Sequence, residues 1–243
     1  MAAPINNDFQ VFVEKTTTEK KICVSIDFGT SGTGYAYSFV DDKTHSVFTN
    51  LKWEGRHENC AKTLSQIVYK NDKPVSYGFP ALKMMTEISE EEELQFHILK
   101  YFKMDLFKST DGFVTDPNAP EGKYKVIDVI VDYLKLFFEK IKKTLNELKI
   151  FDMEEILWCL TIPAIWKDEQ KEVMKIVAER VGLVKSKNDP DLLLILEPEA
   201  AAAYCLHMMK DQGSPIKIGE TFIVVDAGKI QRQKQKKTHH FYL

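Results

Sequence analysis

Apolar residues occur at every second position near the start of the chain, after a polar leader over residues 1–19. Residues 22–28 (ICVSIDF) place Ile, Val, Ile and Phe between Cys, Ser and Asp. This alternation predicts a strand that is largely apolar on both faces and central in a sheet. A glycine-rich turn follows over residues 29–34. We expect two more strands over residues 35–40 and 46–51, which would complete a meander of three short strands.

The spacing of apolar residues changes in the second half of the chain. From residue 126 to residue 148 they recur every three or four positions, with lysines and glutamates on the other face. This spacing predicts a long amphipathic helix packed on a sheet. The later elements alternate: a strand at 156–162, a helix at 167–181 ending before Gly182, a buried strand at 192–196, a helix at 199–209 and a strand at 221–225. The sequence therefore predicts an α/β layered domain.

The middle of the chain, residues 52–124, follows neither pattern and is punctuated by proline and glycine. We expect an insertion with a small fold of its own. Five glutamates lie between Glu87 and Glu93. A run of this kind is more often the solvated start of a helix than a metal site.

Composition and charge narrow the class of protein. Of 243 residues, 44% are hydrophobic and 28% are charged, which is typical of a globular protein. The net charge is −3, and the last fifteen residues carry five Lys/Arg and no acidic residue; subtracting these five positive charges leaves −8 for residues 1–228. An acidic body of this kind argues against a nucleic-acid binder.

The cysteines and the apolar runs bear on the compartment. Four widely spaced cysteines without a C-x-x-C pair favour buried reduced thiols over a disulfide or a metal site. The start of the chain lacks the pattern of a signal peptide, and no apolar run approaches the length of a membrane span. We therefore expect a soluble, cytoplasmic protein with no membrane span.

The glycine-rich turn after the first strand is the first candidate site. Asp27 lies at the carboxyl end of that strand, and Gly29, Thr30, Ser31 and Gly32 follow it. Such a turn can point backbone N–H groups and hydroxyls at phosphate oxygens, while the carboxylate holds Mg²⁺ through water. An ordinary glycine-rich turn between antiparallel strands is the alternative.

Two further acidic residues follow strands. Asp226 ends an apolar strand and precedes Ala227 and Gly228, as Asp27 precedes Gly29. Two such turns suggest related half-domains around one metal–phosphate site. Glu197 lies at a helix start, where a carboxylate is either a simple N-cap or a group facing a cleft that orients water.

Three segments together resemble one known family. Residues 26–31 (IDFGTS) resemble the first phosphate motif of the superfamily of actin, sugar kinases and seventy-kilodalton heat-shock ATPases. Residues 161–166 (TIPAIW) and 168–170 (DEQ) resemble the V-P-A-Y-F and D-x-Q segment of the heat-shock chaperones, and residues 196–202 (LEPEAAA) resemble their N-E-P-T-A-A-A. Ser31 to Tyr35 and Glu199 depart from the usual pattern in a way that resembles the divergent member-twelve branch.

The resemblance implies an actin-like or ribonuclease-H-like ATPase fold with two lobes. Residues 20–51 and 125–211 would form the lower half of lobe one, with residues 52–124 as its upper insertion. Residues 216–228 would be the first strand of a truncated second lobe. Residues 229–243 would be an unrelated basic tail without a strand or helix pattern.

The resemblance also implies roles for particular residues. Gly29, Thr30, Ser31, Gly32 and, from the second motif, Gly228 would contact the phosphates of ATP. Metal-binding roles would fall to Asp27, in the water shell of Mg²⁺, and to Asp226. Glu197 would place the metal or the attacking water. The family's catalytic lysine would be Lys100, with Lys103 as the second choice.

The match stops within the second phosphate motif, at Gly228. The resemblance therefore implies a chain truncated after the first lobe of an ATP-binding, chaperone-related protein, with weak ATP binding and no appreciable hydrolysis. The strand at 221–225 would then have an unpaired edge that promotes aggregation. A non-enzymatic interaction scaffold with unidentified protein partners is the alternative function, and a sugar kinase of the same superfamily is the third.

Overall fold

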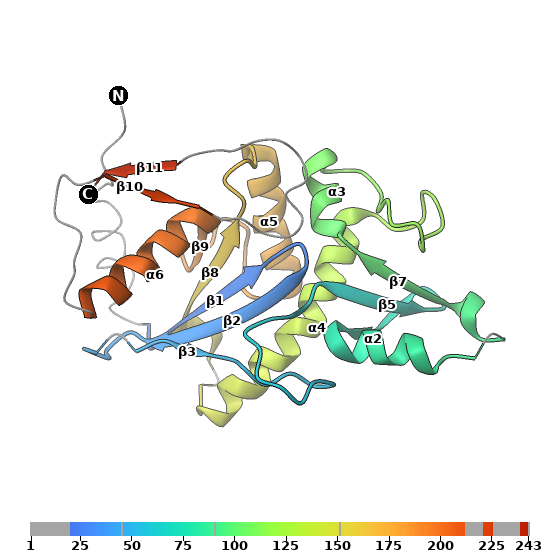
Figure 1. Ribbon diagram of the computed structural model, residues 1–243, viewed down its shortest axis with the longest axis horizontal. Coiled ribbons are helices and arrows are strands. Elements are labelled where there is room, and N and C mark those ends of the chain that lie inside the picture. Colours follow the sequence, from blue (N-terminus) through green and yellow to red (C-terminus); the bar gives the residue numbers. More distant parts are fainter. Residues whose placement is uncertain are drawn as a thin grey trace.

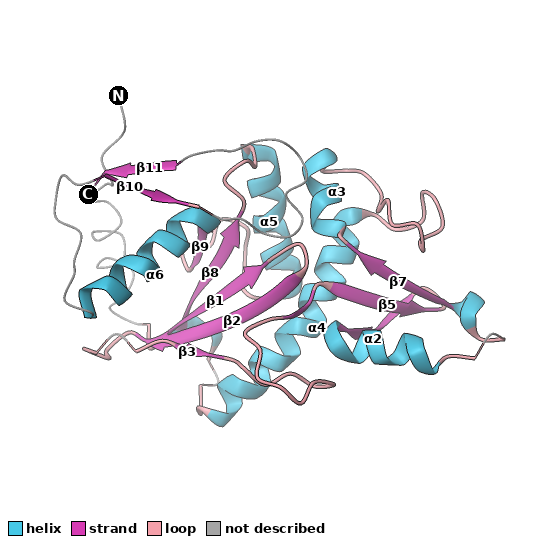
Figure 2. Ribbon diagram, in the orientation of Figure 1, coloured by secondary structure: helices cyan, strands magenta, loops and turns pink. Residues whose placement is uncertain are grey.

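A large mixed sheet forms the centre of the molecule (Figures 1 and 2). The computed structural model describes residues 20–44, 46–89, 91–150, 152–211, 221–225 and 239–242. The strands of the sheet lie in the order β3 (Phe48–Thr49), β2 (Gly32–Phe39), β1 (Ile22–Phe28), β8 (Ile156–Ile162) and β9 (Leu192–Leu196). The short strand β4 (Thr63–Leu64) also pairs with β2. The first three strands are antiparallel, whereas β1, β8 and β9 are parallel.

Strand β1 is central, as its sequence predicts. It pairs with β2 on one side and with β8 on the other, and its residues alternate between buried and half-buried. The side chains of Ile22, Val24, Ile26 and Phe28 are at most 1% exposed. The other face of the strand carries Cys23, Ser25 and Asp27 and is only half-buried, so it is less enclosed than expected.

Three helices accompany the sheet: α4 (Val126–Glu147), α5 (Asp168–Val181) and α6 (Glu197–Asp211). Helix α4 packs its apolar face on the sheet, where the ring of Tyr133 contacts Phe28 and the ring of Phe138 contacts Trp158. Helix α5 ends at Gly182, whose φ of +88° is the left-handed conformation that glycine adopts without strain. Helix α6 runs beside β8 and β9 (Figure 1). The predicted α/β class is confirmed.

The middle of the chain contains a second sheet of three strands, which lies to the right of α4 in Figure 2, on the other side of the helix from the large sheet. Its elements are β5 (Gln66–Lys70), β6 (Lys73–Tyr77) and β7 (Phe96–Lys100), with α2 (Gly78–Glu87), the 3₁₀ turn η1 (Glu93–Gln95) and α3 (Phe102–Lys108). Helix α2 packs on this sheet through Ala81, which lies in a small apolar cluster with Val68 and Ile98. The assignment of residues 52–124 as a separate subdomain stays a prediction.

Several predicted boundaries were wrong. Strand β2 begins at Gly32, three positions before the expected start, because Thr33 already pairs with Phe28. Strand β3 covers only two exposed residues of the six expected. The acidic run extends from the last residue of α2, Glu87, to the first residue of the 3₁₀ turn η1, Glu93, so it precedes a short 3₁₀ turn and not an α-helix. Strand β9 is half-buried, because it lies at the edge of the sheet.

The last described segments also differ from expectation. Strand β10 (Thr221–Val224) pairs in antiparallel register with β11 (His239–Tyr242), which lies in the segment expected to lack a strand pattern. One edge of β10 is therefore paired, and the other has no partner strand among the described residues, so the expected unpaired edge stays a prediction. The leader over residues 1–19, Asp226, Gly228 and most of the basic tail lie outside the described residues.

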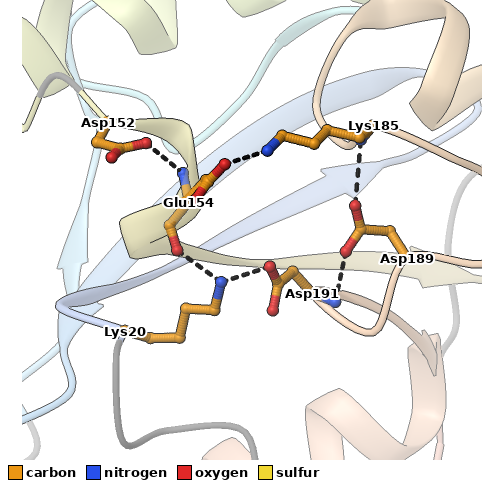
Figure 3. Close-up of polar contacts among 6 residues, drawn as sticks. All are labelled: Lys20, Asp152, Glu154, Lys185, Asp189 and Asp191. Carbon is orange, nitrogen blue, oxygen red and sulfur yellow. Dashed lines mark hydrogen bonds and ion pairs between the residues drawn. The ribbon is translucent and has the colours of Figure 1, made fainter.

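A polar network joins the amino ends of the three parallel strands (Figure 3). The ammonium of Lys20, just before β1, donates to the carbonyl of Glu154 at 2.6 Å and to the carboxylate of Asp191. Glu154 belongs to the 3₁₀ turn η2 (Met153–Glu155) that leads into β8, and Asp191 precedes β9. Lys185 adds an ion pair to Glu154. These contacts lie at the opposite edge of the sheet from the candidate site.

Two findings concern the cysteines and the membrane. All four cysteines are free; Cys23, Cys60 and Cys159 are half-buried and Cys205 is exposed, so they are less enclosed than predicted. Among the described helices, none combines the length and the apolar character that crossing a bilayer requires.

Candidate functional site

The carboxyl ends of the parallel strands bring three polar residues to one edge of the sheet, two of which, Asp27 and Glu197, were predicted as site residues. Asp27 is the penultimate residue of β1, Thr161 is the penultimate residue of β8, and Glu197 follows β9 as the first residue of α6. The hydroxyl of Thr161 donates to Oδ1 of Asp27 at 3.0 Å. The crevice outside the carboxyl ends of parallel strands is where open α/β sheets bind ligands. This edge of the sheet is therefore the candidate site.

The turn between β1 and β2 is shorter and tighter than the sequence suggests. Only residues 29–31 lie between the strands. The N–H of Gly29 donates to the carbonyl of Gly32 at 3.1 Å, and a methyl group placed on Gly29 would lie 2.5 Å from that oxygen. Glycine is required here by close approach of the backbone. Because the N–H of Gly29 is engaged inside the turn, the candidate backbone donors to a phosphate are those of Thr30, Ser31 and Gly32.

Ser65 fixes this turn through two hydrogen bonds to its carbonyl groups. Its hydroxyl donates to the carbonyl of Gly29 at 2.6 Å, and its N–H donates to the carbonyl of Ser31 at 3.1 Å. Ser31 is exposed and Thr30 is half-buried. The turn is thus fixed by two hydrogen bonds while its tip remains open to solvent.

A buried lysine contacts the last residue of β1, next to the turn. The side chain of Lys103, on α3, is only 3% exposed, and its Nζ lies 2.6 Å from Oε1 of Glu197. It also donates to the carbonyl of Phe28, and the rings of Phe28 and Trp166 lie 5.4 Å from the ammonium. Burial lowers the pKa of Lys103, whereas Glu197 opposes this shift by stabilising the charged form. The site therefore contains a desolvated cation held by a carboxylate and a carbonyl.

The structure places Lys103, rather than Lys100, at this position. Lys100 ends β7, and its N–H donates to Oδ2 of Asp116 at 2.8 Å. The chain then turns sharply into α3 at Tyr101, whose φ of +59° is in the left-handed region. This turn carries Lys103 to Glu197. The geometry favours the second sequence candidate, and a catalytic role for either lysine stays a prediction.

Sequence reasoning missed a second lysine. The Nζ of Lys62 lies 2.5 Å from Oδ2 of Asp27, and the two side chains are 46% and 40% exposed. Lys62 comes from the polar segment before β4 and belongs to no recognised motif. The pairing of β4 with β2 brings it to the turn. No local signal could have found it, because the contact depends on this long-range pairing.

The donor set fits a metal that arrives with phosphate. Within the described part of the chain, no group of three or more His, Cys, Asp or Glu side chains could hold a metal ion. Asp27 supplies one partly exposed carboxylate. Mg²⁺ retains several waters and is commonly bound by one or two carboxylates together with substrate phosphates, which matches this arrangement. The second predicted metal residue, Asp226, and the predicted phosphate contact Gly228 lie outside the described residues.

Comparisons with known proteins agree with the motifs. No family model matches the chain. It is 33% identical to mouse heat shock 70 kDa protein 12A over 79% of its length, and 30% identical to human heat shock 70 kDa protein 12B over 90%. Over most of its length, this chain is similar in sequence to the member-twelve heat-shock proteins. The recognition made from the motifs is confirmed.

Each match covers less than half of the other protein. The chain spans 30% of the length of the mouse relative and 34% of the human one. Among solved structures, it resembles MreB5 of Spiroplasma citri bound to ADP, with a TM-score of 0.43, 18% identity, and coverage of 86% of this chain and 46% of that chain.

Proposed function

We propose that this chain forms one wall of an ATP-binding site, in which it contacts the phosphates. The observation that carries the proposal is the buried ammonium of Lys103, paired with Glu197 at the edge where three parallel strands end. Burying an ammonium is costly, and pairing with a carboxylate reduces this cost. A ligand that uses the positive charge would explain why the site keeps a buried cation. The resemblance of residues 26–31 to a phosphate motif supports the same ligand.

The chain's own residues divide the proposed tasks. Lys103 would stabilise negative charge on the phosphoryl group, and Thr30, Ser31 and Gly32 would donate hydrogen bonds to phosphate oxygens. Glu197 would orient the attacking water and accept its proton. Asp27 would hold waters of a bound Mg²⁺, and the metal would neutralise charge on the phosphates. In a longer protein that also supplies the opposing wall of the site, these groups would support hydrolysis of ATP.

We further propose that the 243-residue chain binds ATP weakly and does not turn it over appreciably. The described residues line the proposed phosphate position from one side, and each charge-assisted hydrogen bond contributes about 1.5–3 kcal/mol, so an opposing wall would add several kcal/mol. The names of the relatives and the free cysteines support a chaperone-related protein in a reducing compartment, which we take to be the cytoplasm.

Titration calorimetry with Mg-ATP tests this proposal. We expect a dissociation constant on the order of 1 mM, or about −4 kcal/mol. Lys103→Met should abolish the heat of binding, while Lys100→Met, which removes the same charge from the end of β7, should preserve it. A micromolar constant would contradict weak binding, and equal loss in both variants would contradict the role of Lys103. No binding to the wild type at any concentration would favour a non-enzymatic scaffold.

A further inference from the structure

Both carboxylate oxygens of Asp27 are already engaged by donors of this chain. Oδ1 accepts a hydrogen bond from the hydroxyl of Thr161 at 3.0 Å. Oδ2 lies 2.5 Å from the ammonium of Lys62. Asp27 is the residue that we assign to the water shell of the metal. The Lys62 ammonium therefore lies beside the carboxylate at which the hydrated metal would bind.

The stem of Lys62 follows the glycines of the turn. A methyl group placed on Gly34 would lie 3.1 Å from Cγ of Lys62, one on Gly32 would lie 3.3 Å from its Cβ, and one on Gly29 would lie 3.7 Å from its Nζ. The side chain thus lies across the turn, from β2 towards the end of β1. Side chains at Gly32 and Gly34 would crowd it, so these two glycines also leave room for the lysine.

The backbone next to Lys62 is anchored by strand pairing, whereas the ammonium of Lys62 is partly exposed to solvent. The next residue, Thr63, pairs with Thr33 in β2, which anchors the base of the side chain. The side chain itself is 46% exposed. An exposed ammonium changes partners at little desolvation cost, in contrast to the buried Lys103. Lys62 can therefore exchange the Asp27 carboxylate for another anion close by.

The charges of the site balance without a metal. Two lysines, Lys62 and Lys103, contact two carboxylates, Asp27 and Glu197. Lys103 contacts the carbonyl of Phe28 at the end of β1, and the stem of Lys62 runs along the glycines of the turn. A phosphate at the tip of the turn would lie beside the exposed ammonium of Lys62. With Lys62 between Asp27 and the phosphate, the repulsion between the two anions is screened as a metal would screen it.

We propose that Lys62 is a resident cation that substitutes for Mg²⁺ at Asp27, so that this chain binds the phosphates of a nucleotide with little dependence on the metal. The inference rests on the proposed function and adds a specificity-determining residue to it. An ordinary surface ion pair is the competing explanation, and it would leave the metal dependence of binding unchanged.

The test compares ATP affinity in excess Mg²⁺ and in excess EDTA for the wild type, Lys62→Met and Lys52→Met. Lys52 is an exposed lysine in the same connecting segment, so its variant matches the change in charge. The wild type and Lys52→Met should bind within a few-fold in the two buffers. Lys62→Met should lose about tenfold in EDTA, equivalent to about 1.4 kcal/mol, and much less in Mg²⁺.

Equal loss in both buffers, or no loss, would overturn the inference while leaving the proposed function in place. Absence of ATP binding to the wild type in either buffer would overturn both. Thermal unfolding should show all three proteins equally folded, since an exposed pair contributes about 0–1 kcal/mol.

Discussion

At the scale of single residues, Lys103 determines the character of the site. Its ammonium is withdrawn from water and depends on Glu197, the carbonyl of Phe28 and two aromatic rings for compensation. Burial lowers its pKa from the ordinary value of 10.5, because the charged form loses more hydration than its partners restore. Its charge can stabilise negative charge on a ligand, and its burial lowers the stability of the folded chain.

This imbalance predicts a pH dependence. Between the lowered pKa of Lys103 in the folded state and the ordinary 10.5, the unfolded chain binds more protons than the folded chain. The free energy of unfolding of the wild type should therefore rise relative to that of Lys103→Met as the pH increases through this window. Urea unfolding from neutral pH to pH 10.5 measures the difference. A flat result for Lys103→Met would contradict the burial argument.

At the scale of elements, two sharp turns position the site. The turn over residues 29–31 brings β2 back along β1, and its carbonyls are held by Ser65. The turn at Tyr101 redirects the chain from β7 into α3, at the expense of a left-handed conformation in a bulky residue. The first turn contains the candidate residues Thr30 and Ser31, and the second leads into the helix that carries Lys103 to Glu197.

The tightness of the first turn predicts the effect of an added methyl group. Gly29→Ala would place a carbon 2.5 Å from the carbonyl oxygen of Gly32, so the turn must open. We expect a loss of about 1–3 kcal/mol in the free energy of unfolding, as for other overpacked sites. Ser31→Ala, at an exposed position of the same turn, should change stability little. Chemical denaturation compares the two, and equal stabilities would show that the turn relaxes freely.

At the scale of the whole molecule, the sheet has two different edges. The carboxyl edge gathers the partly exposed charges of Asp27, Lys62 and Glu197 around the buried Lys103. The amino edge gathers Lys20, Glu154 and Asp191 into contacts that join the starts of β1, β8 and β9 (Figure 3). We infer that the second edge contributes to stability, while the first edge is reserved for binding.

Neighbouring lysines allow a matched test of this division. The side chain of Lys20 is 9% exposed, whereas that of Lys21, paired with Glu155, is 62% exposed. Lys20→Met should lower the free energy of unfolding by about 1.5–3 kcal/mol, because it removes charge-assisted hydrogen bonds from a partly buried carboxylate. Lys21→Met should cost about 0–1 kcal/mol. Similar losses in both variants would contradict a special role for the network.

The sequence by itself determined the regular elements and the acidic residues of the site. The bounds of β1, β8 and β9 were predicted to the residue, and those of α4 within one residue. The local sequence marks them, because β1 alternates, β8 and β9 are continuous apolar runs, and α4 has a helical period. Asp27 and Glu197 were found because they lie at the carboxyl ends of such strands. Elements without a clear period, such as α2 and the two-residue β3, were missed or misplaced.

Only the tertiary structure decided which cations meet these carboxylates. Lys103 lies 94 positions from Glu197 in the chain, and Lys62 reaches Asp27 through the pairing of β4 with β2. A lysine in a polar segment has the same local pattern whether it faces solvent or a carboxylate. Its role follows from contacts between distant segments, which no local period records, and the choice between Lys100 and Lys103 depended on one left-handed residue, Tyr101.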